Sequence, residues 1–281
     1  MDSIKNTVFI GKVLNHFDEL PSTNAYASEL LLQPALKLPN LQNTCLTDRN
    51  TCLPDKQAEG VVVSTFNQTF GRGQMGTRWE SEPYQNLAVS IIFRPTFLQA
   101  RQQFHLNKAV ALAVTDFVAE QCGVKTNCGE SKVCIKWAND IYVNDRKIAG
   151  ILIQNTLSGA DIQSTIVGIG LNVNQIQFNN IPNATSLKLE TGKDFVLTDM
   201  LEKLCQCVEK RYLQLKTLRF DALHTQYLDK LFRINVDAVY QYPNGNFFTG
   251  KIVGVGDNGK LMIMTKTGIE NFDIKEVRFV I

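Results

Sequence analysis

A nine-residue segment, GRGQMGTRW at positions 71–79, constrains the fold of this chain more than any other stretch. It sets three glycines beside two arginines, between two runs rich in Val, Ile and Phe at residues 60–66 and 86–93 that are predicted to be strands. Glycine lets backbone N–H groups approach a ligand closely, and arginine adds a charge suited to carboxylate or phosphate. The pattern predicts an anion-binding loop laid across a sheet.

The same segment has the G-x-G-x-x-G spacing of a dinucleotide-binding loop, but its context excludes that interpretation. A dinucleotide-binding fold needs a helix directly after the glycines, whereas Pro83 and a β-rich run follow here. The sequence also lacks the Gly-Lys-Ser/Thr of a P-loop and the H-R-D and D-F-G motifs of protein kinases. A flexible surface loop with incidental arginines remains the alternative.

Length and composition indicate an ordinary globular protein. The 281 residues suffice for one large domain and a small second one. The net charge of +2 gives no general reason to expect nucleic-acid or membrane binding, and no apolar run reaches the about 20 residues of a membrane span. No signal-peptide core, no C-x-x-C motif and no histidine cluster occurs. We expect a cytoplasmic protein with reduced thiols.

The N-terminal part is expected to begin with an edge strand at residues 9–14. Ser22, Thr23 and Asn24 are good N-caps for a helix over residues 25–32. Capping alone explains them, but their spare hydroxyl and amide groups also suit the wall of a pocket.

Residues 33–57 lack periodicity and are rich in Pro, Asn and Thr, which predicts an exposed insertion. Its Cys45 and Cys52 are able to pair only in an oxidising compartment. An amphipathic helix is predicted at residues 101–122, with Gly123 as its C-cap.

A second dense stretch predicts a hairpin from residues 133–143 and 147–153. It brings four polar side chains close together: Lys136, Asn139, Asp140 and Lys147. Lysine is almost never buried without a partner, so these residues suggest a site, although a salt bridge at a strand end is the simpler alternative.

The strand predicted at residues 165–174 carries Gly168 and Gly170 on the same face. Glycine costs strand stability and often marks the close approach of a ligand or of backbone. A flat ligand on the cleared face and close helix packing are both compatible with this pattern.

The C-terminal part changes character near Ile234. Helices are predicted at residues 197–218 and 220–231, and short strands with Asn-Gly and similar turns follow. These strands predict a small β-barrel, which gives two domains at residues 1–234 and 235–281.

Five segments together resemble one family, the biotin protein ligases, in the family's order. The glycine loop matches the biotin and adenylate loop, and Gly168 to Asn172 matches Gly-x-Gly-x-Asn. The other three segments are Ser22-Thr23-Asn24, KWAND at residues 136–140 and KIAGIL at residues 147–152. The resemblance implies an α+β fold, with a mixed, largely antiparallel sheet packed with helices and a small C-terminal SH3-like β-barrel.

The resemblance also implies a two-step reaction. Biotin and ATP with Mg²⁺ would form biotinyl-5′-AMP and pyrophosphate. A lysine of a biotin carboxyl carrier protein domain, from acetyl-CoA carboxylase or a related carboxylase, would then attack the adenylate and release AMP. Neutralising a carboxylate that approaches a polyphosphate requires positive charge, for which the sequence offers Arg72 and Lys147.

The site residues that the resemblance implies fall into three groups. Lys147, Arg72 and Asp140 would be catalytic, and Asp140 would either orient the incoming lysine or bind the metal, for which no side-chain ligand set is evident. Biotin would contact Ser22, Thr23, Asn24, Gln68, Arg72, Gly73, Gln74, Lys147, Gly150, Gly168 and Gly170. The nucleotide would contact Arg72, Arg78, Trp79, Lys136, Asn139, Lys147 and Asn172, although a core role for Trp79 fits equally well.

The chain departs from the family's pattern at three points. Gln74 replaces a second arginine, and Ala138 replaces a proline. The motif at Ser22 follows only 21 residues, so we expect a form without an N-terminal DNA-binding domain. We therefore expect no nucleic-acid or membrane partner, and a monomer or weak homodimer.

Two other functions remain compatible with the sequence. A lipoate or octanoate ligase or transferase of the same fold would share the sheet and the lysine, but not the basic glycine loop before Trp79. A non-catalytic protein that binds biotin or a nucleotide would not release AMP in the presence of a carrier domain.

Overall fold

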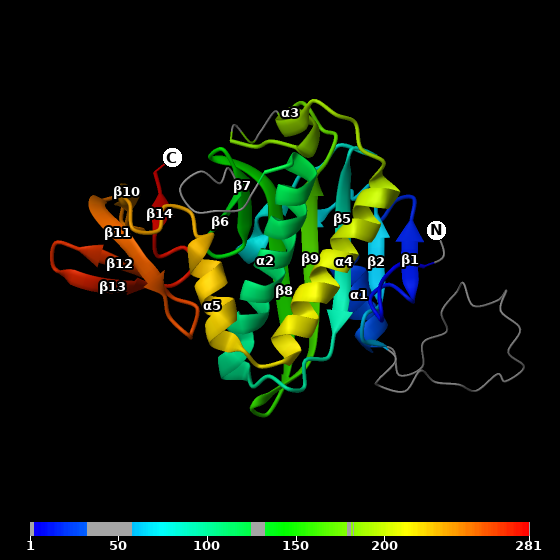
Figure 1. The fold of residues 1–281 in the computed structure, drawn as a ribbon, viewed down its shortest axis with the longest axis horizontal. Coiled ribbons are helices and arrows are strands. Elements are labelled where there is room, and N and C mark those ends of the chain that lie inside the picture. Colours follow the sequence, from blue (N-terminus) through cyan, green and yellow to red (C-terminus); the bar gives the residue numbers. More distant parts are fainter. Residues whose placement is uncertain (1–2, 33–57, 125–132, 179–180, 182, 281) are drawn as a thin grey trace, which may run out of the picture.

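The computed structural model describes residues 3–32, 58–124, 133–178, 181 and 183–280. Their centre is a seven-stranded sheet, which lies behind two long helices in Figure 1. Its strand order is β1-β2-β5-β9-β8-β7-β6, and β1–β2 is its parallel pair. The strands are β1 Leu14–Phe17, β2 Val62–Thr65, β5 Asn86–Phe93, β6 Val133–Lys136, β7 Asp140–Val143, β8 Arg146–Ser158 and β9 Asp161–Asn172. This mixed, largely antiparallel sheet packed with helices confirms the predicted α+β class.

Helices cover both faces of the sheet. The helices are α1 Thr23–Leu32, α2 Gln103–Cys122, α3 Leu187–Thr191, α4 Leu197–Lys216 and α5 Phe220–Asp229. Ile91 and Val167 belong to the large core cluster that contains the buried residues of α2 and α4. Ile92 follows Ile91 on β5, and Ile166 precedes Val167 on β9. Both point to the other face and pack with Ala27 of α1. Strands covered on both sides are rich in apolar residues, and β5 shows this, since all eight of its residues are buried and six are apolar.

A second sheet, antiparallel throughout, forms the C-terminal part and lies beyond α5 in Figure 1. Its order is β13-β12-β11-β10-β14. The strands are β10 Asp237–Gln241, β11 Phe247–Val255, β12 Leu261–Thr265, β13 Gly268–Phe272 and β14 Arg278–Phe279. The change to short strands after Ile234 is thus confirmed, while the SH3-like assignment and the boundary between residues 234 and 235 stay predictions.

The prediction of a strand at residues 9–14 was wrong in position. Residues 9–12 form a turn in which Gly11 adopts φ +71°, and the edge strand β1 begins at Leu14. The helix at residues 101–122 is confirmed over Gln103–Cys122, and Gly123 ends it with φ +66°. The short helix α3 was not predicted. The insertion at residues 33–57, with Cys45 and Cys52, lies outside the described residues.

No helix in the described part of the chain combines the length and the apolar character needed to cross a membrane.

A buried carboxylate holds the N-terminal turn on α4. Glu209 accepts hydrogen bonds from the backbone N–H groups of Val8, Phe9 and Ile10 at 2.7, 2.8 and 2.9 Å. Only 5% of Glu209 is exposed, so water does not replace these bonds in the folded protein. The turn leads directly into β1, and Glu209 therefore stabilises one edge of the large sheet.

Replacing Glu209 by alanine is expected to destabilise the protein. Hydrogen bonds to a charged group contribute about 1.5–3 kcal/mol each, so the loss should be roughly 3 kcal/mol or more. Thermal unfolding followed by circular dichroism measures it, with Lys210→Ala, an exposed neighbour on α4, as the control. Equal melting temperatures for Glu209→Ala and Lys210→Ala would contradict the assignment.

Candidate active site

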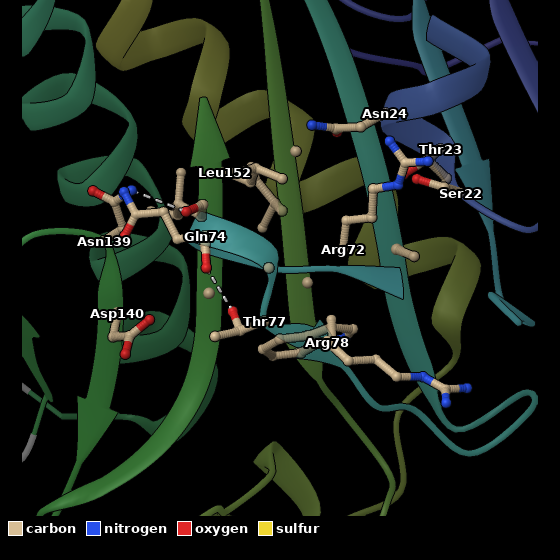
Figure 2. Close-up of a pocket in the computed structure, with 18 of the residues that line it drawn as sticks. Ser22, Thr23, Asn24, Arg72, Gln74, Thr77, Arg78, Asn139, Asp140 and Leu152 are labelled. Atoms are coloured by element: carbon tan, nitrogen blue, oxygen red, sulfur yellow. Dashed lines mark hydrogen bonds between the residues drawn. The ribbon is translucent and has the colours of Figure 1, made fainter. Parts of the chain in front are cut away.

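A pocket of about 360 Å³ lies on the sheet face that α1 covers. Figure 2 shows its two ends, with Ser22, just before α1, and Thr23 and Asn24 of α1 at one side, and Asn139 and Asp140 at the other. The sheet, the glycine loop, α1 and the C-terminal part all contribute to the wall. The lining residues are Ser22, Thr23, Asn24, Gln68, Arg72, Gly73, Gln74, Thr77, Arg78, Trp79, Ala88, Asn139, Asp140, Lys147, Gly150, Ile151, Leu152, Gly168, Ile169, Gly170, Ile274 and Lys275.

The glycine loop is an ordered hairpin over the sheet. Its strands are β3 Gly71–Arg72 and β4 Arg78–Trp79, joined through a 3-10 turn at Gln74–Gly76. The Gly73 N–H donates to the Thr77 carbonyl at 2.6 Å, and the Thr77 hydroxyl donates to the Gln74 carbonyl at 2.8 Å (Figure 2). Gly76 has φ +80°, which a side chain would disfavour. These bonds fold the loop into a hairpin that forms part of the pocket wall.

The α1 end of the pocket is polar and formally uncharged apart from one arginine. The Gln68 side-chain oxygen accepts from the Thr23 N–H at 2.9 Å, and Asn24 donates to the side-chain oxygen of Gln154 at 2.8 Å. Thr23 and Asn24 are buried, and both line the pocket. The guanidinium of Arg72 points toward these α1 residues in Figure 2. This end therefore offers a dense set of hydrogen-bonding groups with one positive charge beside them.

The opposite end carries an ion pair. The Lys147 ammonium lies 2.7 Å from the Asp140 carboxylate, and each side chain remains about a third exposed, at 27% and 32%. Antiparallel pairing of β7 with β8 sets Asp140 opposite Gly150, which brings Lys147 within reach. The predicted clustering of Asp140 and Lys147 is confirmed, and so is the salt bridge that was its simpler alternative.

Asn139 lies beside the ion pair, and both polar atoms of its side chain are hydrogen-bonded within the protein. Its amide nitrogen donates to the Ile151 carbonyl at 3.1 Å, and its oxygen accepts from Asn107 at 2.7 Å. Asn139 therefore stiffens the loop that carries Asp140, and its contact with a nucleotide stays a prediction.

Trp79 covers the face that the glycines clear. An ideal Cβ at Gly150 or Gly170 would meet the indole ring, and one at Gly168 would meet the Asn24 side chain. The Lys147 ammonium lies 5.6 Å from the centre of the indole ring, a cation–π distance. The predicted close approach at the glycines is real, but side chains of the protein make it in this structure.

Three predicted nucleotide contacts lie apart from the centre of the pocket. Lys136 lies in a neighbouring pocket of about 330 Å³, where its ammonium is 3.1 Å from the Tyr142 hydroxyl and burial lowers its pKa. Asn172 does not line the pocket, and its amide donates to the Thr185 carbonyl at 2.9 Å. Arg78 is at the pocket rim, but its guanidinium points away in Figure 2.

Arg78 is held in that outward position by two contacts. It donates to the Thr69 carbonyl at 3.2 Å, and its guanidinium carbon lies 5.6 Å from the centre of the Phe70 ring. Gln74, in contrast, lies on the Asn139 side of the pocket in Figure 2. In this structure Arg78 and Gln74 therefore point to different sides of the pocket, and compensation by Arg78 for the missing arginine stays a prediction.

Seven lining residues were not among the predicted site residues: Thr77, Ala88, Ile151, Leu152, Ile169, Ile274 and Lys275. Ile274 and Lys275 come from the turn between β13 and β14. Lys275 adopts φ +71°, an unusual backbone conformation for a residue other than glycine. No motif marks this turn, and only the docking of the second sheet brings it to the pocket.

Among the described residues, no group of three or more His, Cys, Asp and Glu side chains is arranged to hold a metal ion. Asp140 is the acidic residue in the pocket wall, and its carboxylate is paired with Lys147. Binding of Mg²⁺ by Asp140 stays a prediction.

Known proteins are similar to this chain in sequence and in fold. The model of the Biotin/lipoate A/B protein ligase family matches residues 37–172. The "Bifunctional ligase/repressor BirA" of Bacillus subtilis is 34% identical over 218 residues, which cover 75% of this chain and 64% of that protein. The "Biotin--[acetyl-CoA-carboxylase] ligase" of Paracoccus denitrificans is 29% identical over 83% of this chain and 98% of its own length.

The solved structure of the Aquifex aeolicus biotin protein ligase in complex with biotin and ATP superposes with a TM-score of 0.70. At 24% identity it covers 96% of this chain and 100% of its own, which shows a common fold. The chain spans 64% of the length of its Bacillus subtilis relative. Sequence and fold agree with the motifs that line the pocket, and residues 37–172 are similar to the Biotin/lipoate A/B protein ligase family.

Proposed function

We propose that this chain is an ATP-dependent ligase that activates biotin as biotinyl-5′-AMP and transfers it to a lysine of a carrier protein. The observation that carries the proposal is the division of one pocket into a hydrogen-bonding end at α1 and a charged end at Lys147 and Asp140. Biotin has the same division, with a polar ureido ring at one end and a carboxylate at the other. Relatives named as biotin ligases from Paracoccus denitrificans and Mycobacterium tuberculosis support the same function.

In the first step, a biotin carboxylate oxygen attacks the α-phosphorus of ATP, and the bond to the departing pyrophosphate breaks. Two anions must approach, so a fixed positive charge lowers the barrier. Lys147 supplies that charge at the charged end, and Arg72 adds a second charge beside the biotin. Mg²⁺ bound with ATP would shield the phosphates further.

In the second step, the lysine amine of the carrier attacks the carbonyl carbon, and AMP leaves with the electron pair of the C–O bond. The attacking nitrogen must lose a proton. Among the described residues Asp140 is the carboxylate that lines the pocket, and it accepts this proton once Lys147 is engaged with the adenylate. The carrier is a biotin carboxyl carrier protein domain of acetyl-CoA carboxylase or a related carboxylase, as the name of the Paracoccus denitrificans relative suggests.

The polar α1 end favours biotin over lipoate or octanoate, the main alternative. Thr23 and Gln68 keep hydrogen-bonding capacity toward the pocket beyond the bond between them, and a hydrocarbon chain or a dithiolane ring would leave that capacity unmatched, which costs binding energy. Exchange of pyrophosphate into ATP that depends on biotin, and not on lipoate or octanoate, tests this choice.

Replacing Lys147 by alanine is expected to abolish adenylate formation while the fold persists. Loss of one such electrostatic contact costs on the order of 3 kcal/mol or more, roughly a hundredfold in rate. Biotin-dependent ATP–pyrophosphate exchange is the measurement. The control is Lys188→Ala, which breaks a surface ion pair of 2.6 Å with Asp194. Wild-type exchange in Lys147→Ala would remove Lys147 from the mechanism.

Gln74 is expected to make release of biotinyl-adenylate fast. Glutamine lacks the charge that the family's arginine brings, and Arg78 is turned away. A charge-assisted hydrogen bond contributes about 1.5–3 kcal/mol, so Gln74→Arg should slow release roughly tenfold to a hundredfold.

The matched variant is Arg78→Ala, which should leave the release rate unchanged. Preformed biotinyl-adenylate is followed after dilution into excess unlabelled biotin. Fast release in Arg78→Ala together with no effect of Gln74→Arg would show that Arg78 compensates after all.

We propose that the chain binds no specific DNA sequence, although a Bacillus subtilis relative is named a ligase/repressor. Its 29 Lys and Arg residues are nearly balanced by 27 Asp and Glu residues, which gives little general attraction to phosphate backbones. A gel-shift assay with the promoter DNA of its own gene at physiological salt should show no specific complex. A sequence-specific shift that survives added salt would overturn this proposal.

We also propose a cytoplasmic location and a monomer or weak homodimer. The edge strand β1 is only four residues long, which limits sheet-to-sheet pairing between copies. Sedimentation at increasing protein concentration measures the assembly.

A further inference from the structure

A chain of hydrogen bonds runs beneath the α1 end of the pocket and passes through Ser90 of β5. The Ser90 hydroxyl lies 2.8 Å from the Thr23 hydroxyl and 2.6 Å from the side-chain oxygen of Asn24. Asn24 continues the chain by donating to Gln154 at 2.8 Å. Ser90 is fully buried and does not line the pocket, unlike Thr23 and Asn24. Ser90 therefore acts on a ligand only through its two neighbours.

The direction of each bond in this chain follows from the chemistry of its atoms. The Asn24 oxygen only accepts, so at 2.6 Å the single hydrogen of Ser90 must point toward it. Ser90 then has no hydrogen left for Thr23. The bond of 2.8 Å between the two hydroxyls must use the hydrogen of Thr23. The other acceptor within reach of Thr23, the Gln68 oxygen, is farther away at 3.3 Å.

This direction fixes what the pocket presents to a ligand. Thr23 donates its hydrogen to Ser90, so both lone pairs of its oxygen stay available and it serves the pocket as an acceptor. The Gln68 oxygen accepts from the Thr23 N–H at 2.9 Å, which leaves the Gln68 amide nitrogen as a donor. An acceptor and a donor from neighbouring side chains match a ring N–H beside a carbonyl, which is the pattern of a cyclic urea.

We propose that Ser90 is a positioning residue that holds Thr23 as an acceptor and thereby makes the pocket select a cyclic urea over a cyclic carbamate. The proposal rests on the proposed function, because the urea is the head group of biotin. A carbamate analogue of biotin, with one ring N–H replaced by oxygen, sets a lone pair against that of Thr23. In Ser90→Ala the Thr23 hydroxyl is free to turn its hydrogen into the pocket and accommodate either ligand.

The test compares biotin with its two carbamate analogues, one for each ring nitrogen, by calorimetric binding and by ATP–pyrophosphate exchange. We expect the wild type to bind at least one analogue more weakly than biotin. The ratio of the two affinities should be roughly ten to a hundred, the range for an unmatched buried polar group. Ser90→Ala should reduce that ratio to about threefold or less, and should raise the KM for biotin about tenfold with kcat nearly unchanged.

Two further variants separate this role from a general structural one. Thr23→Val removes the acceptor and should lower the ratio as Ser90→Ala does, while the double variant should be no lower than Thr23→Val alone. Ser64→Ala is the matched control, because Ser64 is a buried serine of the neighbouring strand β2 that bonds His16 at 2.9 Å. It should retain the wild-type ratio.

A wild-type ratio in Ser90→Ala would overturn the proposal, and so would additive effects of Ser90→Ala and Thr23→Val. If Ser90→Ala does not fold, an unchanged ratio in Thr23→Val overturns it instead. Binding of biotin without pyrophosphate exchange in the wild type would contradict the proposed ligase activity alone, because the binding ratios still test Ser90.

Discussion

The contact of the Trp79 indole with the backbone of two central strands is the constraint on which the pocket depends. Gly150 of β8 and Gly170 of β9 face each other in the register of the sheet. A Cβ at Gly170 would overlap the indole, and one at Gly150 would contact it tightly at 3.0 Å. The ring therefore sets how closely the β3–β4 hairpin approaches the sheet. Arg72 and Gln74 lie on that hairpin, so their positions follow from the same contact.

The sequence was sufficient for those parts of the fold and site that local rules determine. Strand periodicity predicted the central strands, and the Gly168–Gly170 alternation predicted a close approach at one face. Short hairpin geometry predicted that Asp140 and Lys147 would meet. All of these depend on neighbours in the chain or in the register, which residue spacing encodes.

Other parts depend on distant segments and could not be predicted. Asn172 shares the strand face of Gly170, but the segment at Thr185 covers it and takes its amide. The Lys136 ammonium lies over the ring of Phe279, from the C-terminal sheet. The role of Ser90 was invisible because one hydroxyl in an apolar strand carries no pattern, and only the fold brings it to Thr23 and Asn24.

The docking of the C-terminal sheet onto the large one has a thermodynamic consequence. The Trp137 indole N–H donates to the Gly259 carbonyl at 2.9 Å, which ties a turn of the second sheet to the loop before Asp140. Since Lys275 and Asp140 line one pocket, a ligand that touches both binds only the docked arrangement. Part of the binding free energy of such a ligand then stabilises the docking of the two sheets. A ligand that contacts both halves therefore raises the free energy needed to separate them and couples their unfolding.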